Sequence, residues 1–189
     1  MQAEIIIAGF GGQGALFAGQ LLAYAAMDEG RHVTWIPSYG PEMRGGTAHC
    51  TVIIADDEIG SPLMRHPSAV IAMNQPSLEK YAPRVAAGGV LVAEALAAQA
   101  APEYPRLRLL VVPANVEAER LGSPKSANLV LLGALVALTQ GSVALPLAAL
   151  ERALEAHLPA HHHHLLEANR QALRRGAALA EAGAVGVEA

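Results

Sequence analysis

The sequence of 189 residues contains a single cysteine, Cys50. One thiol cannot form a disulfide within the chain, and scarce cysteine is typical of proteins from a reducing compartment. Residues 1–4 carry no lysine or arginine ahead of the short apolar run that follows, so the features of a secretory signal peptide are missing. We therefore expect a cytoplasmic location.

Basic residues are also few. The chain has 13 Lys and Arg against 17 Asp and Glu, which gives a net charge of -4 at pH 7. Binding to a phosphate backbone needs clustered basic side chains. Only a small cluster occurs, at Arg170, Arg174 and Arg175. This charge balance excludes nucleic acid as the main partner.

A long uninterrupted hydrophobic run is missing too. The uncharged stretch 126–150 is long enough to cross a membrane, but its unbroken apolar part covers only residues 129–138. We expect a buried helix there and no membrane contact. Because 52% of the residues are hydrophobic and the mean hydropathy is +0.30, the chain is more apolar than an ordinary soluble monomer, which indicates subunit interfaces.

What the sequence does contain is a succession of short apolar runs separated by helical patterns. The runs predict strands at residues 4–8, 32–37, 48–55, 69–73, 89–93 and 107–112. Near-continuous apolar runs are typical of strands buried in a parallel sheet. Helices are predicted between them at residues 15–27, 76–85 and 114–121. The order predicts an α/β fold with a doubly wound, mostly parallel, Rossmann-like sheet.

The last third of the chain is predicted to be helical. Ser123 as N-cap and Pro124 as first helical residue predict a helix that runs to Leu138. Two amphipathic helices follow, and their apolar stripes are Leu147, Leu150, Leu154 and Leu158 in one and Leu165, Ala168, Ala172 and Leu179 in the other. Since no linker separates these helices from the core at 1–122, residues 123–189 are assigned to the same single domain, 1–189.

Residues 9–14, Gly-Phe-Gly-Gly-Gln-Gly, match the pattern G-x-G-x-x-G directly after a predicted strand and before a predicted helix. In this position backbone N–H groups and the helix dipole hold a phosphate. A tight turn and close packing of helix on strand would explain the same glycines without a ligand. We favour an anion site formed by Gly9, Gly11, Gly12, Gln13 and Gly14.

Two further absences limit the ligand of this site. A nicotinamide dinucleotide is usually held by Asp or Glu at the end of the second strand, but strand 32–37 runs into Ser38. Asp28 and Glu29 precede that strand at a helix end, where a solvated role explains them. No Gly-Lys-Ser/Thr follows the glycines, which excludes a P-loop.

A second glycine-rich segment, residues 38–47, is expected near residues 9–14, at the carboxyl ends of the strands. Its candidate binding residues are Tyr39, Arg44, Gly45 and Gly46. Arg44 can bind a phosphate or a carboxylate, and neighbouring glycines let a ligand approach the backbone. A structural ion pair between Arg44 and an acid such as Glu42 remains the alternative.

Five ordered motifs give the sequence a specific resemblance. They are GFGGQG at 9–14, YGPEMRGGTAHC at 39–50, EIGSP at 58–62, AMNQPS at 72–77 and AERLGSPKSANLVLLGAL at 118–135. Together they resemble the gamma subunit or gamma domain of the 2-oxoacid:ferredoxin oxidoreductases, the family that acts on pyruvate, 2-oxoglutarate and 2-ketoisovalerate. The tail after Gly141 adds little to this resemblance.

The resemblance implies a complex that converts a 2-oxoacid and coenzyme A to an acyl-CoA, carbon dioxide and reduced ferredoxin, with the carbon chemistry on thiamine diphosphate. This chain lacks the Gly-Asp-Gly motif of thiamine enzymes, and one cysteine cannot bind a four-cysteine cluster. Thiamine diphosphate, Mg and Fe-S clusters are therefore expected on alpha, beta and ferredoxin-like delta subunits. Ferredoxin would be the electron acceptor, and the chain alone would be inactive.

The resemblance also implies that this chain contributes to binding coenzyme A. Carried over to this sequence, Gly11, Gly12, Gln13 and Gly14 form the loop, Tyr39, Arg44, Gly45 and Gly46 a second wall, and Asn74 a neighbouring polar group. No catalytic residue and no metal site is assigned. Two alternatives stay open, namely a self-contained dehydrogenase that binds NAD or FAD, and an assembly module without a ligand.

Four other features receive structural interpretations. Cys50 lies in an apolar strand and is interpreted as a buried, unreactive side chain, and His49 beside it as structural. Asn128 can either bond a loop or a subunit, or cap its own helix. The four histidines 161–164 indicate a solvated helix start rather than a metal site, because neighbouring residues do not share one helical face.

Overall fold

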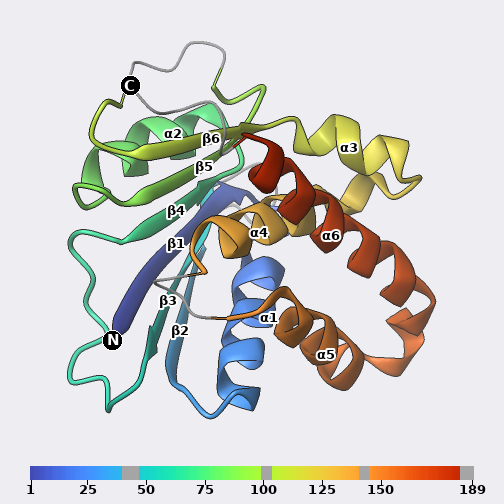
Figure 1. The fold of residues 1–189 in the computed structure, drawn as a ribbon, viewed down its shortest axis with the longest axis horizontal. Helices are drawn as coiled ribbons and strands as arrows, with labels where there is room; N and C mark the ends of the chain where they lie inside the picture. The colour runs from blue at the N-terminus through green and yellow to red at the C-terminus, as the bar shows by residue number, and fades with distance from the viewer. Residues whose placement is uncertain (40–46, 99–103, 141–144, 184–189) are drawn as a thin grey trace.

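The computed structural model describes residues 1–39, 47–98, 104–140 and 145–183. Its centre is a six-stranded sheet with the strand order β2-β3-β1-β4-β5-β6 (Figure 1). The strands are β1 (Gln2–Phe10), β2 (His32–Tyr39), β3 (Thr47–Ala55), β4 (Ala69–Ala72), β5 (Val90–Glu94) and β6 (Arg108–Val112). β1, β4, β5 and β6 pair in parallel, which confirms the mostly parallel α/β sheet.

β3 runs against its neighbours. It is antiparallel to both β1 and β2, although its apolar sequence suggested a parallel strand. Only residues 40–46 separate β2 from β3, which is too short for the crossover that a parallel pair requires. The reversal brings Thr47 opposite Phe10 and Tyr39 opposite Ala48, at the edge of the sheet where β1 ends.

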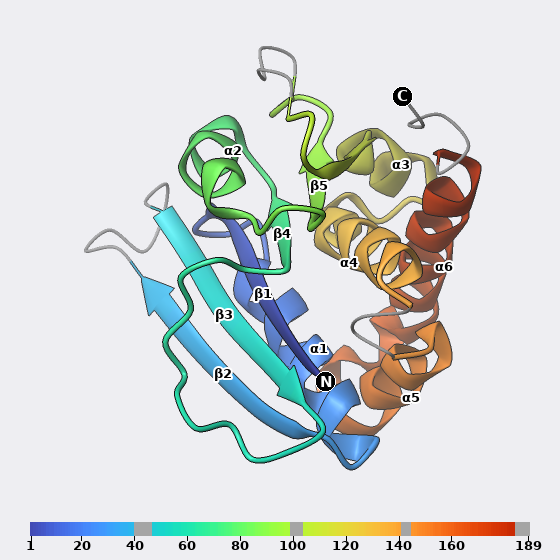
Figure 2. The ribbon, with the colours of Figure 1, turned by 60° about the vertical axis from the view of Figure 1, so that its left-hand side comes forward.

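Helices cover both faces of the sheet, as a doubly wound fold requires (Figures 1 and 2). The larger core lies under α1 (Ala15–Asp28) and the C-terminal helices, and the smaller core lies under α2 (Gln75–Tyr81). Alternate residues of β1 point to opposite faces. Accordingly Ile5 and Ile7 belong to the larger core, and Ile6 and Ala8 to the smaller one.

The last third of the chain is helical, as predicted. Its helices are α4 (Ala127–Leu138), α5 (Leu147–His157) and α6 (Leu166–Gly183), with 3-10 turns at Pro124–Ser126 and Ala160–Leu165; α3 (Ala114–Arg120) and a 3-10 turn at Ala82–Arg84 lie before them. No helix in these described ranges is both long and apolar enough to cross a membrane. In α4, nine residues from Asn128 to Val136 are buried, consistent with the buried helix expected there.

Two predicted details of these helices are wrong. The side chain of Ser123 caps nothing; Pro124 begins a 3-10 turn, and the Ser126 hydroxyl donates to the Ser123 carbonyl at 2.7 Å. The α-helix therefore starts only at Ala127. Leu165, predicted in the apolar stripe of the last helix, lies in the preceding 3-10 turn and is 38% exposed, because that turn does not continue the helical phase.

α4 and α6 pack against each other (Figure 1), and at two glycines their backbones meet with no side chain between them. A Cβ at Gly133 would overlap the Leu173 carbonyl, and a Cβ at Gly176 would overlap the Val130 carbonyl. Both glycines thus let the two backbones touch. Since α4 packs on the sheet, this contact holds α6 to the rest of the molecule.

A buried acid joins α3 to α6. Glu117 is 4% exposed and accepts hydrogen bonds from Arg175 at 2.6 Å and from Arg120 at 2.7 Å. The hydrogen bond from Arg175 is the main reason that the pKa of Glu117 is lowered from its usual 4.5. A lowered folded-state pKa adds stability above the unfolded pKa, and that stability is lost as the pH falls through the folded value.

Replacing Arg175 by alanine is expected to lower the free energy of unfolding at pH 7 by about 1.5 kcal/mol, the lower end for a charged hydrogen bond because Arg175 is 41% exposed. It should also flatten the fall in stability below pH 4.5. Urea unfolding from pH 3 to 7 measures both, with Arg106→Ala as a surface control. Equal acid slopes for the variant and the parent would contradict this role.

Candidate functional site

The glycine loop, by which we mean residues 9–14, comprises the end of β1 and the turn after it, and lies beside the carboxyl ends of β4 and β5. The helices that follow β1 and β4 lie on opposite faces of the sheet (Figure 2). In doubly wound sheets a crevice opens where the winding changes direction in this way, and ligands bind there. The glycine loop therefore lies at the position where this class of fold binds ligands.

The glycines of the loop have different roles. A Cβ at Gly9 would crowd Met73, so Gly9 allows close packing against the end of β4. Gly12 and Gly14 have φ values of 99° and 79°, which favour glycine. No atom lies within 4 Å of the position of a Cβ at Gly12, which is exposed and lines a cavity, whereas Gly14 is the N-cap of α1. Packing thus explains Gly9 but not Gly12.

Gln13 and Asn74 hold the loop in place. The Gln13 side-chain oxygen accepts from the Phe10 N–H at 2.7 Å and from the Asn74 amide at 3.0 Å, and the Gln13 amide donates to the Met73 carbonyl at 3.3 Å. The Asn74 oxygen in turn accepts from the Ser77 N–H and caps α2. The structure thus brings these two predicted residues together as a brace between β1 and β4.

Asn128 bonds the loop rather than its own helix. Its amide donates to the Gly14 carbonyl at 3.1 Å, and the residue is 5% exposed. Of the two alternatives, the loop contact is the one formed. The bond fixes the start of α4 against the start of α1, two segments that are 114 residues apart in the sequence.

The start of α1 has no side-chain cap. Its N-cap, Gly14, has no side chain to accept from the first-turn N–H groups, and the first turn holds no acidic residue. Such N–H groups and the positive end of the helix dipole attract an anion. The glycine loop leads directly into this first turn.

A cavity of about 200 Å³, the loop cavity, lies beside the loop. Its polar lining consists of Gly12, Gln13, Glu94, Asn115, Lys125 and Asn128. Lys125 is exposed, and no ion pair joins it to Glu94, the other charged residue of this described lining. Glu94 is 3% exposed, and one of its oxygens accepts from the Leu96 N–H at 2.6 Å. The cavity thus presents donors to an anion and a carboxylate to a donor group.

Sequence reasoning missed Lys125, Glu94 and Asn115. Lys125 lies in the motif at 118–135 that carries the resemblance, so its position could have been noted. Glu94 ends β5, and a charged residue at the carboxyl end of a strand is a signal of the same kind. Their approach to the glycine loop depends on how α4 packs, which local patterns do not reveal.

The second predicted wall is only partly described. The backbone of Tyr39 ends β2 and pairs with Ala48, at the same edge of the sheet as the glycine loop. Arg44, Gly45 and Gly46 lie outside the described residues. The positions of the two strand ends agree with the expected neighbourhood of the segment, and the part of these residues in binding stays a prediction.

Cys50 and His49 have the environments expected of structural residues. Cys50 is fully buried, and burial raises the pKa of its thiol to about 12, so it carries no thiolate at neutral pH. Burial, with Lys80 and Arg84 nearby, lowers the pKa of His49. The histidines 161–164 are exposed in a 3-10 turn, and the described residues contain no group of His, Cys, Asp and Glu that could hold a metal ion.

Known proteins of one family are similar to this chain in sequence and in fold. The family model described as "Pyruvate ferredoxin/flavodoxin oxidoreductase" matches residues 4–179. The ketoisovalerate oxidoreductase subunit VorA of Methanothermobacter thermautotrophicus is 44% identical over 137 residues, which are 72% of this chain and 28% of VorA. The chain therefore spans less than a third of that relative.

Solved structures agree with this sequence match. The gamma subunit of a keto/oxoacid ferredoxin oxidoreductase from Geobacter sulfurreducens superposes with a TM-score of 0.79 at 32% identity, over 95% of this chain and 99% of that chain. The 2-oxoglutarate:ferredoxin oxidoreductase from Magnetococcus marinus, with 2-oxoglutarate, coenzyme A and succinyl-CoA bound, gives 0.83 at 24% identity, over 96% and 31%, and shows the fold alone. The chain belongs to the pyruvate ferredoxin/flavodoxin oxidoreductase family.

Proposed function

We propose that this chain is the gamma-type subunit of a 2-oxoacid:ferredoxin oxidoreductase and that its loop cavity binds a phosphate of coenzyme A. The observation that carries the proposal is that Gly12 and Lys125 line one cavity beside the uncapped start of α1. The related fold from Magnetococcus marinus occurs in a complex with coenzyme A, which supports this ligand. Family membership favours neither a self-contained dehydrogenase nor a module without a ligand.

The residues of this chain would bind and orient the ligand rather than react with it. Backbone N–H groups of the loop and the Lys125 ammonium would hold the phosphate, and the Glu94 carboxylate would accept a hydrogen bond from a hydroxyl or amide of the same ligand. These contacts restrict where the rest of a long ligand can reach.

The remaining cofactors of the reaction do not fit this chain. Its only thiol is buried and protonated, which is unsuitable for an Fe-S cluster, and the described residues hold no acidic cluster for Mg. Thiamine diphosphate, Mg and the clusters would be held by alpha, beta and delta subunits, with ferredoxin as acceptor, in the cytoplasm. Large exposed apolar side chains, among them Leu63 at 84% and Leu96 at 64%, suit contacts with such subunits.

Replacing Lys125 by alanine is expected to weaken coenzyme A binding at least about tenfold, because one charge-assisted contact to a phosphate is lost. Gly12→Val should have a similar effect, since Gly12 lines the cavity and its φ of 99° is unfavourable for valine. Calorimetric titration of the full chain with coenzyme A measures both affinities.

Lys80→Ala is the matched control, because it removes the same charge from α2, outside the loop cavity. Its affinity for coenzyme A should equal that of the parent. If Lys125→Ala and Gly12→Val bind coenzyme A as tightly as the parent, the cavity is not the site. Recovery of the native chain under gentle conditions without any thiamine-binding subunit would contradict the assignment to the complex.

A further inference from the structure

The basic side chains on the two faces of the sheet differ in their partners. On the face that carries the larger core, each arginine of α5 and α6 forms an ion pair with a carboxylate, namely Arg152, Arg170, Arg174 and Arg175. On the other face, near α2, Arg65, Lys80 and Arg84 are exposed and form no ion pair with an acid of the described ranges. The charges near α2 are thus left without a partner in this part of the chain.

Lys80 and Arg84 are held against one aromatic ring. The Lys80 ammonium lies 5.0 Å and the Arg84 guanidinium carbon 5.7 Å from the centroid of the Tyr81 ring, which are cation–π contacts. The His49 ring packs on Tyr81 from β3, with 5.5 Å between the ring centroids. Burial, and the charges of Lys80 and Arg84, lower the pKa of His49. Two like charges are therefore fixed close together at one side of α2.

The connection between β3 and β4, residues 56–68, extends this positive surface. It lies on the same face of the sheet as α2 (Figures 1 and 2), where Met64 packs against the smaller core and its carbonyl accepts from Arg84 at 3.4 Å. Leu63 and Arg65, the neighbours of Met64 in sequence, are both exposed. Leu63, at 84%, is the most exposed large apolar side chain of the described residues. We call Leu63, Arg65, Lys80 and Arg84 the basic patch.

The acids near the basic patch do not neutralise it. Asp57 and Glu58, at the start of the same connection, form no ion pair within the described part of the chain, and neither does Glu79 on α2. The Glu79 carboxylate accepts a hydrogen bond from Gln75 at 2.8 Å instead. Like charges that are fixed near each other repel, and a partner that brings carboxylates relieves this repulsion. An exposed leucine among basic side chains also has the composition of a protein interface.

We infer that the basic patch binds an acidic protein surface on another subunit of the complex, whose carboxylates meet Arg65, Lys80 and Arg84 and whose apolar side chains cover Leu63. A small anion would leave Leu63 in water, whereas a protein surface covers it. A second copy of this chain fits less well, because the carboxylates of its α5 that could meet the patch, Glu151 and Glu155, are already ion-paired. The inference rests on the proposed function only for the existence of the complex, and not on the loop cavity.

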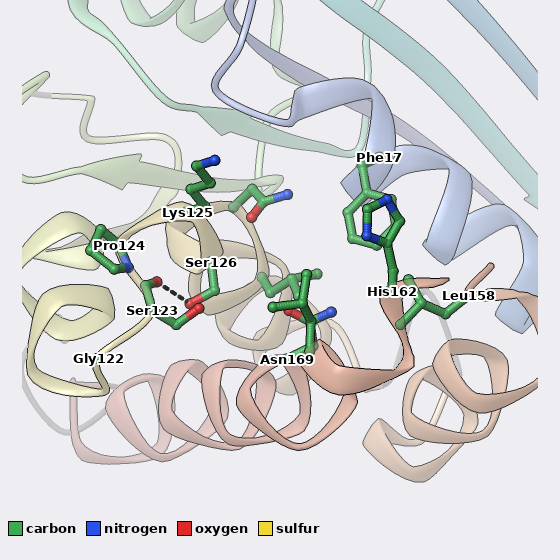
Figure 3. Close-up of a pocket in the computed structure, with 12 residues that line it drawn as sticks. Phe17, Gly122, Ser123, Pro124, Lys125, Ser126, Leu158, His162 and Asn169 are labelled. Carbon is green, nitrogen blue, oxygen red and sulfur yellow. Dashed lines mark hydrogen bonds between the residues drawn. The ribbon is translucent and has the colours of Figure 1, made fainter. Parts of the chain in front are cut away.

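Cross-linking of the assembled complex tests the partner. A carbodiimide joins a lysine amine to a carboxylate in direct contact, and the chain has only two lysines, Lys80 and Lys125. Lys125 lines the cavity drawn in Figure 3, so mass spectrometry of the linked peptides separates its products from those of Lys80. Lys80 should be linked to an aspartate or glutamate of another subunit, and Lys80→Arg should lose this product without loss of assembly. A Lys80 that is unlinked, or linked only within its own chain, would overturn the inference.

Charge reversal measures what the contacts contribute. Lys80→Glu and Arg84→Glu should each weaken association of the full chain with the remaining subunits at least about tenfold at low salt, because an attraction is replaced by a repulsion. Arg152→Glu, the same change in charge on α5, is the control and should weaken association less than about twofold. Replacing the linked carboxylate of the partner by lysine should restore the affinity of Lys80→Glu. An unrestored affinity would show that the lysine does not meet that carboxylate.

Failure of this inference differs from failure of the proposed function. A complex that assembles and forms an acyl-CoA, with Lys80 unlinked and both reversals without effect, would remove the acidic partner and leave the proposed function standing. A chain isolated without partner subunits would remove both. Binding of the free chain to phosphatidylglycerol vesicles, lost in Arg84→Glu while assembly is unchanged, would assign the basic patch to a membrane surface and overturn the inference.

Discussion

Replacing Gly176 by valine is expected to abolish the native packing of α6 and lower the free energy of unfolding by more than about 3 kcal/mol. A side chain at this position meets the backbone carbonyl of Val130 in α4 rather than a movable side chain. This clash can be relieved only if α4 and α6 move apart along their whole contact. Gly133→Val should cost a similar amount, because it meets the Leu173 carbonyl from the other helix.

Urea unfolding followed by circular dichroism measures this effect. Gly60→Val is the matched control, because a Cβ at Gly60 meets no atom within 4 Å and its backbone has no positive φ. The control should unfold within about 0.5 kcal/mol of the parent, as surface substitutions do. A Gly176→Val protein with the parent's unfolding midpoint would mean that α4 and α6 are not in backbone contact.

Gly14→Ala is expected to damage stability and binding together. Its φ of 79° is unfavourable for alanine by about 1–2 kcal/mol, and its Cβ would lie 2.5 Å from the Asn128 amide nitrogen. The amide must move, so its hydrogen bond to the Gly14 carbonyl is lost as well. Adding about 1 kcal/mol for that bond, we expect a loss of about 2–3 kcal/mol in the free energy of unfolding.

A double-mutant cycle with Asn128→Ala isolates the second part of this loss. The double variant should be less destabilised than the sum of the two single variants by about 1 kcal/mol, because the clash and the bond share one partner. Denaturant midpoints of the four proteins give the coupling. Strict additivity would show that Gly14 is required for its backbone conformation alone.

The fold could be predicted well from the sequence because its signals are local. Six apolar runs mark the strands, and the glycine loop marks the first turn. The direction of β3 could not be predicted from its side chains, since a buried strand is apolar whichever way it runs; the length of the connection 40–46 was the better signal. The Ser123 side chain does not cap a helix as predicted, because Pro124 starts a 3-10 turn, and the hydrogen bonds of that turn differ from those at the start of an α-helix.

Only the part of the candidate site near the glycine loop was predicted from the sequence. Residues next to the glycines in sequence, and Asn74 at the end of a strand, could be recognised from motifs. Lys125 lies in a motif too, but its approach to the glycine loop could not be predicted, because it depends on a segment far along the chain from the loop and on the packing of α4, which makes backbone contact with α6. Such contacts have no periodic signature in the sequence.

The hydrogen bonds of the Gln13 side chain affect the rate at which a ligand binds in the crevice. Its single oxygen accepts two hydrogen bonds, and its amide adds a third, so the loop is tied to β4 before any ligand arrives. A prearranged loop loses little conformational entropy on association, and no folding step needs to precede capture. The encounter rate at this crevice should then depend on ionic strength through Lys125, and hardly at all on a slow rearrangement of the loop.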